Sequence, residues 1–289
     1  MPRRPLHAQH PSPLARLAPP SDRPISRCVV NNAAMPIHPD LAPHSAPARP
    51  ELTGGRRIGV LVQHGFTGSP WSVRAWAEHL AGRGYAVEVP LLPGHGTSWR
   101  ELNGTGWDDW YGEVRRAFDS LLASNDAVVV AGLSLGGGLV LRLAADRPDD
   151  VSGIALVNPA VNTTRRDVKA LPVLKWVVPA FPAIANDIKK EGQDERAYPR
   201  TPLRAAHSMM QGWRALRADL GRVRAPILMF RSVEDHVVDP SSGRIITSSV
   251  SSTDVTERLL ENSFHVATLD HDADAIFSET ADFVARVTA

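Results

Sequence analysis

From about residue 57 onward, short apolar runs alternate with longer stretches in which apolar residues recur every three or four positions. Uninterrupted apolar runs are typical of strands buried on both faces of a parallel sheet, and the wider spacing is typical of helices with one buried face. The runs predict strands at 57–63, 85–90, 127–131, 151–157, 226–230 and 255–260, and the spaced stretches predict helices at 70–82, 107–122, 135–144, 207–220 and 272–287. The alternation predicts an α/β domain over residues 53–289, with a mostly parallel central sheet flanked by helices.

The alternation is interrupted after the strand at 151–157. Five prolines break an apolar segment there, which is too broken for a sheet strand and too apolar for a solvated loop. We expect a small cap at about 160–207, with Trp176, Val177 and Phe181 as candidate substrate contacts. A packing layer without substrate contact is the alternative, and the same three side chains could instead meet a membrane surface or a second subunit.

The first 52 residues contain 12 of the 24 prolines and show no apolar periodicity. This composition predicts a disordered, proline-rich N-terminal extension. Translation starting at Met35 would make most of it an upstream extension of a shorter protein. Peptides preceding Met35 in a mass spectrum of the native protein would contradict that hypothesis.

Charge and cysteine content narrow the function classes. The chain has 32 basic and 31 acidic residues, and its first 50 residues hold six Arg against Asp22 and Asp40, which leaves 26 basic and 29 acidic residues for the rest. This distribution does not indicate nucleic-acid binding. The single Cys28 excludes an internal disulfide and fits a reducing compartment. Because no apolar run approaches the roughly 20 residues of a membrane span, we expect a soluble, cytoplasmic protein without a transmembrane segment.

The sequence GLSLG at 132–136 stands between the predicted strand at 127–131 and an apolar helical stretch. Strand, Gly-x-Ser-x-Gly and helix together form the context of a nucleophile elbow, in which Ser134 sits on a sharp, strained turn. Glycine neighbours allow the backbone to fold sharply and leave room for a substrate. A plain structural turn is the alternative, because the pattern alone arises by chance with a probability on the order of 0.1 in a chain this rich in Gly and Ser.

A nucleophilic serine needs a base, and the base needs a carboxylate that fixes its tautomer. Asp235 follows Ser134 by 101 positions and His265 follows by another 30, each just past a predicted strand. The order Ser, Asp, His is that of the α/β hydrolases, and open parallel sheets gather such loops at the carboxyl ends of their strands. The competing candidates nearby are Glu234, Asp239, His236 and His271.

An oxyanion hole needs two backbone N–H donors. We expect one from Leu135, directly after the serine, and the other from Phe66 in the loop after the first strand. His64 is expected to hold this loop through hydrogen bonds rather than to transfer protons. A metal site built from His64, His95 and Asp108 is the weaker alternative, because no His-x-x-x-His or Cys pair supports it.

Six stretches together resemble the bacterial carboxylesterase and monoacylglycerol lipase branch of the α/β hydrolases: HGFTGSP (64–70), LPGHGT (92–97), TGWDDWYGEV (105–114), GLSLGGGL (132–139), VEDHVVDP (233–240) and HVATLDHD (265–272). The resemblance runs from about Ile58 to the C-terminus. It implies an α/β-hydrolase fold with a small cap, and a cofactor-free serine hydrolase of short- to medium-chain acyl esters or monoacylglycerols. The site residues that it implies are Ser134, Asp235 and His265 as the catalytic triad, with Phe66 and Leu135 as oxyanion donors. The N-terminal extension has no counterpart in this pattern, and the cap matches in the fewest residues.

One triad supports several chemistries, so carbon–carbon bond hydrolysis, acyl transfer and a catalytically silent ligand receptor are the alternative functions. Product analysis with and without an alcohol acceptor separates the first two from ester hydrolysis. Failure of Ser134 to react with a fluorophosphonate probe would favour the receptor. The expected partner is a small acyl ester or a monoacylglycerol, with transient contact to a lipid surface and no nucleic acid. The sequence indicates no oligomeric state.

Overall fold

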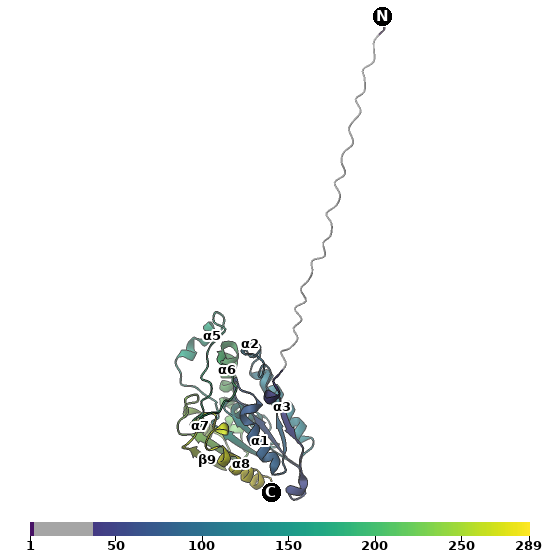
Figure 1. The fold of residues 1–289 in the computed structure, drawn as a ribbon, viewed down its shortest axis with the longest axis vertical. Coiled ribbons are helices and arrows are strands. Elements are labelled where there is room, and N and C mark those ends of the chain that lie inside the picture. Colours follow the sequence, from purple (N-terminus) through teal and green to yellow (C-terminus); the bar gives the residue numbers. More distant parts are fainter. Residues whose placement is uncertain (3–36) are drawn as a thin grey trace. The chain divides into compact units, whose positions relative to one another are not determined.

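The computed structural model describes residues 1–2 and 37–289, and its centre is a seven-stranded sheet (Figure 1). The strand order is β1-β3-β2-β4-β5-β8-β9. Every neighbouring pair is parallel except β1 and β3, which are antiparallel. The strands are β1 His44–Ala46, β2 Ile58–Gln63, β3 Ala86–Val89, β4 Ala127–Leu133, β5 Gly153–Val157, β8 Ile227–Ser232 and β9 Val255–Leu260. The predicted mostly parallel sheet is therefore confirmed.

Helices cover both faces of this sheet, and Figure 1 shows α1 beside α8 on one of them. The α-helices are α1 Arg74–Gly82, α2 Trp99–Leu102, α3 Trp107–Leu122, α4 Leu135–Asp146, α5 Leu171–Leu174, α6 Leu203–Asp219, α7 Ser241–Ser249 and α8 Ala273–Val287. The 3₁₀ helices of the described residues are η1 Pro39–Leu41, η2 Pro50–Leu52, η3 Pro70–Val73, η4 Asp167–Ala170, η5 Leu220–Arg222 and η6 Ala267–Leu269. No helix among the described residues combines the length and apolarity needed to cross a membrane.

The unbroken apolar run of the central strand β4 is explained by its burial on both faces of the sheet. Val128 and Val130 face one core, which they share with side chains of α3, α4 and α6. Val129 and Ala131 face the other core, which contains side chains of α1 and α8. Because successive strand residues point to opposite faces, β4 is buried on both sides, and its carboxyl end lies in the middle of the sheet edge where loops can converge.

The N-terminal boundary differs from the prediction. Residues 37–52 were expected to be disordered, but β1 pairs with β3, with His44 opposite Val89 and Ala46 opposite Val87. Arg49 fixes the following turn, because its Nη2 donates to the carbonyl oxygen of Ala81 at 2.7 Å. A three-residue strand among prolines carries no detectable periodicity, which is why the sequence did not predict it. The rest of the predicted extension, including the Met35 start, lies at residues 3–36, outside the described residues.

The segment between β5 and α6 forms the predicted cap. It contains η4, α5 and a two-stranded antiparallel sheet of β6 Ala180–Pro182 and β7 Arg200–Pro202. The expectation that this segment holds no strand was therefore wrong, and α6 begins at Leu203 instead of 207. Leu171 of α5 packs on Leu203 and Ala206 of α6, with Phe66 against them. The cap is thus fixed over the loop that follows β2.

Candidate active site

Ser134 lies at the turn between β4 and α4 in a rare backbone conformation. Its φ is 54° and its ψ is −118°, a region that non-glycine residues occupy only where the surrounding structure enforces it. A Cβ on Gly136 would overlap the main-chain oxygen of Gln63 in β2, and a Cβ on Gly132 would lie 2.5 Å from the carbonyl group of Gly136. The two glycines are therefore required by close backbone contacts at the turn, as the elbow pattern predicts.

The backbone of Ser134 is tied to the neighbouring strand. Its N–H donates to the Val157 carbonyl oxygen at 3.0 Å, and its own carbonyl oxygen accepts the N–H of Ala160 at 3.0 Å. These bonds join the end of β4 to the loop that follows β5. They hold the serine in place although its conformation is strained.

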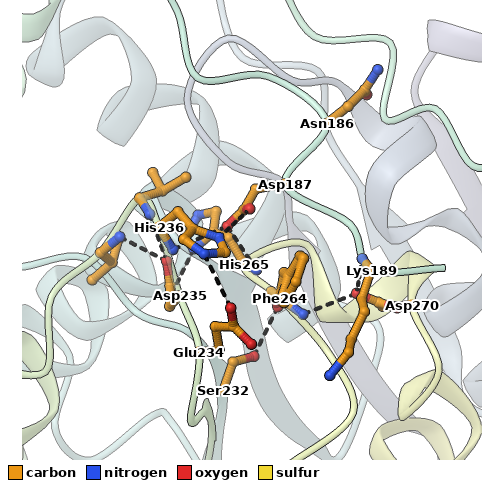
Figure 2. Close-up of polar contacts among 12 residues, drawn as sticks. Asn186, Asp187, Lys189, Ser232, Glu234, Asp235, His236, Phe264, His265 and Asp270 are labelled. Atoms are coloured by element: carbon orange, nitrogen blue, oxygen red, sulfur yellow. Dashed lines mark hydrogen bonds and ion pairs between the residues drawn. The ribbon is translucent and has the colours of Figure 1, made fainter. Parts of the chain in front are cut away.

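Asp235 and His265 form a buried pair at the same edge of the sheet (Figure 2). Asp235 follows β8 and His265 follows β9, and Nδ1 of His265 is 2.8 Å from Oδ2 of Asp235. Each side chain is 8% exposed. The other oxygen of Asp235 accepts the N–H groups of Val237 and Val238, both at 2.8 Å. The carboxylate therefore places the proton on Nδ1 and leaves Nε2 free to act as a base.

Electrostatics favour the charged form of both members of the pair. Burial alone would raise the pKa of Asp235, but the charge and hydrogen bond of His265 lower it below its usual value. Burial alone would lower the pKa of His265, but the carboxylates of Asp235, Glu195 and Asp187 raise it above the ordinary histidine value. The imidazolium that forms when a base accepts a proton is thus stabilised in advance.

The competing acids and histidines have other partners. Asp239 accepts the Ser241 N–H at the start of α7, which is a helix-capping role. Glu234 is exposed and faces Nε2 of His236 at 3.4 Å. The ring of His236 turns to Asp187 instead of Asp235, and His271 contacts the Asp270 carboxylate through its backbone N–H.

Asn158 connects the serine side of the site to the histidine side, a role that the sequence did not predict. Its Nδ2 donates to the carbonyl oxygen of His265 at 2.8 Å, and its Oδ1 accepts the Ser232 N–H at 2.7 Å. It lies two residues before Ala160, which holds the carbonyl oxygen of Ser134. Within the described residues Ser134 Oγ makes no hydrogen bond to His265, and such bonds often form only with substrate present. The only signal for Asn158 in the sequence was its position directly after β5.

The loop after β2 lies against Ser134. A Cβ on Gly65 would be 3.3 Å from the Cβ of Ser134. His64 holds the loop, because its Nδ1 is 2.9 Å from the Gly65 oxygen and its Nε2 accepts the Leu92 N–H at 3.2 Å. Burial lowers the pKa of His64 to about 4, so the ring is neutral. Phe66, predicted as an oxyanion donor, follows directly on this loop.

The alternative metal site receives no support. The rings of His64 and His95 lie edge to face, with centroids 5.2 Å apart. Nδ1 of His95 is 3.2 Å from the Pro93 oxygen, and burial holds its pKa well below the ordinary value. The part of the chain that the structure describes contains no group of three His, Cys, Asp or Glu side chains suited to a metal ion.

A mostly apolar cavity of about 230 Å³ opens beside Ser134, between the sheet edge and the cap. Its wall includes Phe66, Leu171, Leu174, Phe181, Ile184, Leu203, Met209, Trp213 and Val238. Phe181 is thus placed where the sequence predicted a substrate contact. Trp176 and Val177 are not: they lie outside this wall and are 69% and 75% exposed. The physical reason is that the turn of α5 directs Leu171 and Leu174 inward, so the residues that follow face solvent.

Two further carboxylates from the cap face the histidine. Glu195 carries a charge that acts on His265, and burial raises its own pKa. Asp187 is 9% exposed and accepts the backbone N–H of His265 at 3.2 Å. Neither was predicted, because an irregular segment has no periodicity that would assign its side chains to a site. Charge gave no signal either, because residues 186–196 carry seven charged side chains.

The chain matches one protein family and is similar to several known proteins. Residues 55–272 match the family Hydrolase_4, described as serine aminopeptidase, S33. The chain is 37% identical over 243 residues to a thermostable monoacylglycerol lipase of Bacillus sp. (strain H-257), across 83% of this chain and 95% of that protein. It is 26% identical over 240 residues to a carboxylesterase of Bacillus subtilis (strain 168), across 83% and 97%. A solved structure from work on two metagenome-derived lipolytic enzymes, LipS and LipT, has a TM-score of 0.82 and 37% identity, and covers 87% of this chain and 100% of that one.

Proposed function

The chain belongs to the Hydrolase_4 family, serine aminopeptidase S33, and we propose that within this family it is a carboxylic ester hydrolase that cleaves short- to medium-chain acyl esters or monoacylglycerols through an acyl-enzyme on Ser134. The observation that carries the proposal is the strained Ser134 at the end of β4 together with the buried Asp235–His265 pair at the ends of β8 and β9. The names of the two Bacillus relatives, a monoacylglycerol lipase and a carboxylesterase, support the same class of ester substrates.

The reaction needs one base and one oxyanion site. Nε2 of His265 takes the proton from Ser134 Oγ as the oxygen attacks the ester carbonyl, and Asp235 stabilises the resulting imidazolium. The N–H groups of Phe66 and Leu135 receive the negative oxygen. His265 then protonates the departing alcohol, and water enters by the same route to release the acid. No cofactor takes part in this scheme.

The cavity supports the proposed acyl length. At about 230 Å³ it lies below the roughly 300–1,000 Å³ of pockets that enclose drug-sized ligands. Phe181, Ile184 and Trp213 supply apolar surface that suits an alkyl chain. The charged residues of the wall, Arg165 and Asp167, pair with each other at 2.6 Å. A short or medium acyl chain fits this wall, with its carbonyl group at Ser134.

We further propose that the cap makes transient contact with a lipid surface. Val173, Trp176 and Val177 are 69–75% exposed in and just after α5. The Lys175 ammonium and the Arg204 guanidinium lie 5.3 Å and 5.0 Å from the Trp176 ring. Apolar side chains with cations beside them are suited to an anionic interface. We place the protein in the cytoplasm, which the single Cys28 supports.

The decisive experiment measures hydrolysis of p-nitrophenyl esters of increasing chain length beside 1-monoacylglycerols. Wild type should turn over esters and react with a fluorophosphonate probe, and Ser134→Ala should lose both. A folded wild type that is inert on every ester would refute the proposal. Transfer of the acyl group to an added alcohol instead of water would assign acyl transfer to the same triad.

A further inference from the structure

A short stretch of the cap, residues 186–190, is bound to the loop that carries His265 (Figure 2). Two carboxylates make the connection. Asp187 belongs to the cap and reaches the catalytic loops, whereas Asp270 belongs to the loop and reaches the cap. Both are buried, at 9% and 2% exposure.

Asp187 binds the backbone of the base and the residue next to the acid. Its Oδ2 accepts the N–H of His265 at 3.2 Å and the N–H of His236 at 3.1 Å. Its Oδ1 is 2.7 Å from Nδ1 of the His236 ring. Its main-chain oxygen accepts the N–H of Val266 at 3.1 Å. One cap residue therefore fixes the distance between the loops that present Asp235 and His265.

Asp270 provides a natural comparison. It accepts the backbone N–H groups of Lys189 at 2.6 Å, Lys190 at 2.9 Å, Phe264 at 2.9 Å and His271 at 2.8 Å. These bonds fasten the cap to the same loop, but none of them reaches His265 or His236. Asp270 therefore shares the structural role of Asp187 without its contact to the catalytic base.

We propose that Asp187 is a positioning residue of the catalytic site, which sets the acid and base loops relative to one another from the cap and places a carboxylate beside His265. This inference rests on the proposed function, because it needs His265 to act as the base. Asp187 is not among the residues that line the cavity beside Ser134. It acts through His265 and His236 alone.

The charges around the two histidines predict how Asp187 changes the pKa of His265. His265 faces Asp235 from the acid loop and Glu195 and Asp187 from the cap, and all three raise its pKa against the effect of burial. His236 faces Asp187 and Glu234, which raise its pKa. When His236 is protonated it offsets part of the Asp187 charge. Removing Asp187 should therefore lower the pKa of His265, and removing the His236 ring should raise it.

The test compares pH profiles of kcat/KM on a soluble p-nitrophenyl ester for wild type, Asp187→Asn, Asp270→Asn and His236→Gln. The acid limb of this profile reports the pKa of the base in the free enzyme. We expect the limb of Asp187→Asn to move to lower pH by about half a unit, with kcat reduced about tenfold and KM within about twofold, because the residue positions the base without binding substrate. The limb of His236→Gln should move to higher pH, and that of Asp270→Asn should coincide with wild type.

An Asp187→Asn limb that coincides with those of wild type and Asp270→Asn would overturn the proposal and leave Asp187 a structural residue. Circular dichroism and thermal melts establish that each variant is folded. If Asp187→Asn does not fold, an unmoved limb in His236→Gln overturns the proposal on its own. A wild type inert on every ester refutes the proposed function instead, so the two failures are distinguishable.

Discussion

At the scale of single residues, the site depends on which ring nitrogen of His265 carries its proton. The Asp235 carboxylate can only accept, so it keeps the proton on Nδ1 and leaves Nε2 as the base. Three carboxylates around one buried imidazole also explain why its pKa is raised although burial acts the other way. In the proposed mechanism this arrangement favours the imidazolium that forms when His265 accepts the proton of Ser134.

Replacing Asp235 with Asn should remove both the negative charge and the control of the His265 tautomer. The amide can donate to Nδ1 and so stabilise the wrong tautomer, and we expect kcat to fall about 10⁴-fold, as for the serine protease acid that serves as the general precedent. Stopped assays on a p-nitrophenyl ester would measure it. Glu234→Gln is the matched control, because its side chain is 58% exposed and does not contact His265. A comparable loss of kcat in the control would indicate that Glu234, and not Asp235, is the acid of the triad.

Single residues also show which parts of the candidate site the sequence could indicate. Ser134, Asp235 and His265 could be proposed because each follows a strand that the sequence predicted, and the structure places all three after such strands. Asn158 and Asp187 could not, because their partners lie 107 and 78 positions away. A contact across that distance depends on how loops settle on the finished sheet, and no local spacing encodes it. The outward direction of Trp176 was missed for a local reason: the short turn of α5 places Leu171 and Leu174 inward, and the sequence pattern did not reveal that turn.

At the scale of elements, the turn between β4 and α4 requires glycine at position 136. Gly136→Ala would drive a methyl group against the main-chain oxygen of Gln63 in β2, so we expect the free energy of unfolding to fall by about 1–3 kcal/mol and activity to fall with it. Urea unfolding followed by tryptophan fluorescence measures the change.

The control for this substitution is Gly112→Ala in the middle of α3. An added Cβ meets nothing within 4 Å there, so the variant should gain about 0.5–1 kcal/mol from helix propensity. Equal effects of the two substitutions would show that the close contact at the elbow is not what demands glycine.

The exposed end of the cap is the second element with a prediction. Trp176→Ser should weaken binding to anionic vesicles about tenfold, since burying a large apolar side chain is worth about 1.5–3 kcal/mol. Sedimentation with vesicles of phosphatidylglycerol and phosphatidylcholine measures it. Hydrolysis of a soluble p-nitrophenyl ester should stay at the wild-type rate, because Trp176 lies outside the cavity wall. Unchanged vesicle binding would contradict the proposed lipid contact.

At the scale of the whole molecule, the buried histidines set how stability depends on pH. Burial lowers the pKa of His64 from 6.5 to about 4 and holds that of His95 well below 6.5. Between pH 6.5 and about 4 these two rings are protonated in the unfolded chain but stay neutral in the folded protein. The unfolded state therefore binds more protons, and stability falls as pH falls. His265 acts in a different window: its raised pKa gives stability that is present below 6.5 and is lost as pH rises through its folded value.

These opposite effects predict a maximum of stability near pH 6.5. Each depressed histidine contributes a slope of about 1.4 kcal/mol per pH unit on the acid side, which amounts to about 3 kcal/mol for His64 across its whole shift. Glu195, whose pKa burial raises, reduces the slope. Urea midpoints at pH 5, 6.5 and 8 would locate the maximum. His95→Asn keeps a donor for the Pro93 oxygen but cannot be protonated, so the stability of this variant should fall less steeply on the acid side. Equal urea midpoints at pH 5 and 6.5 in wild type would show that burial does not keep these rings neutral.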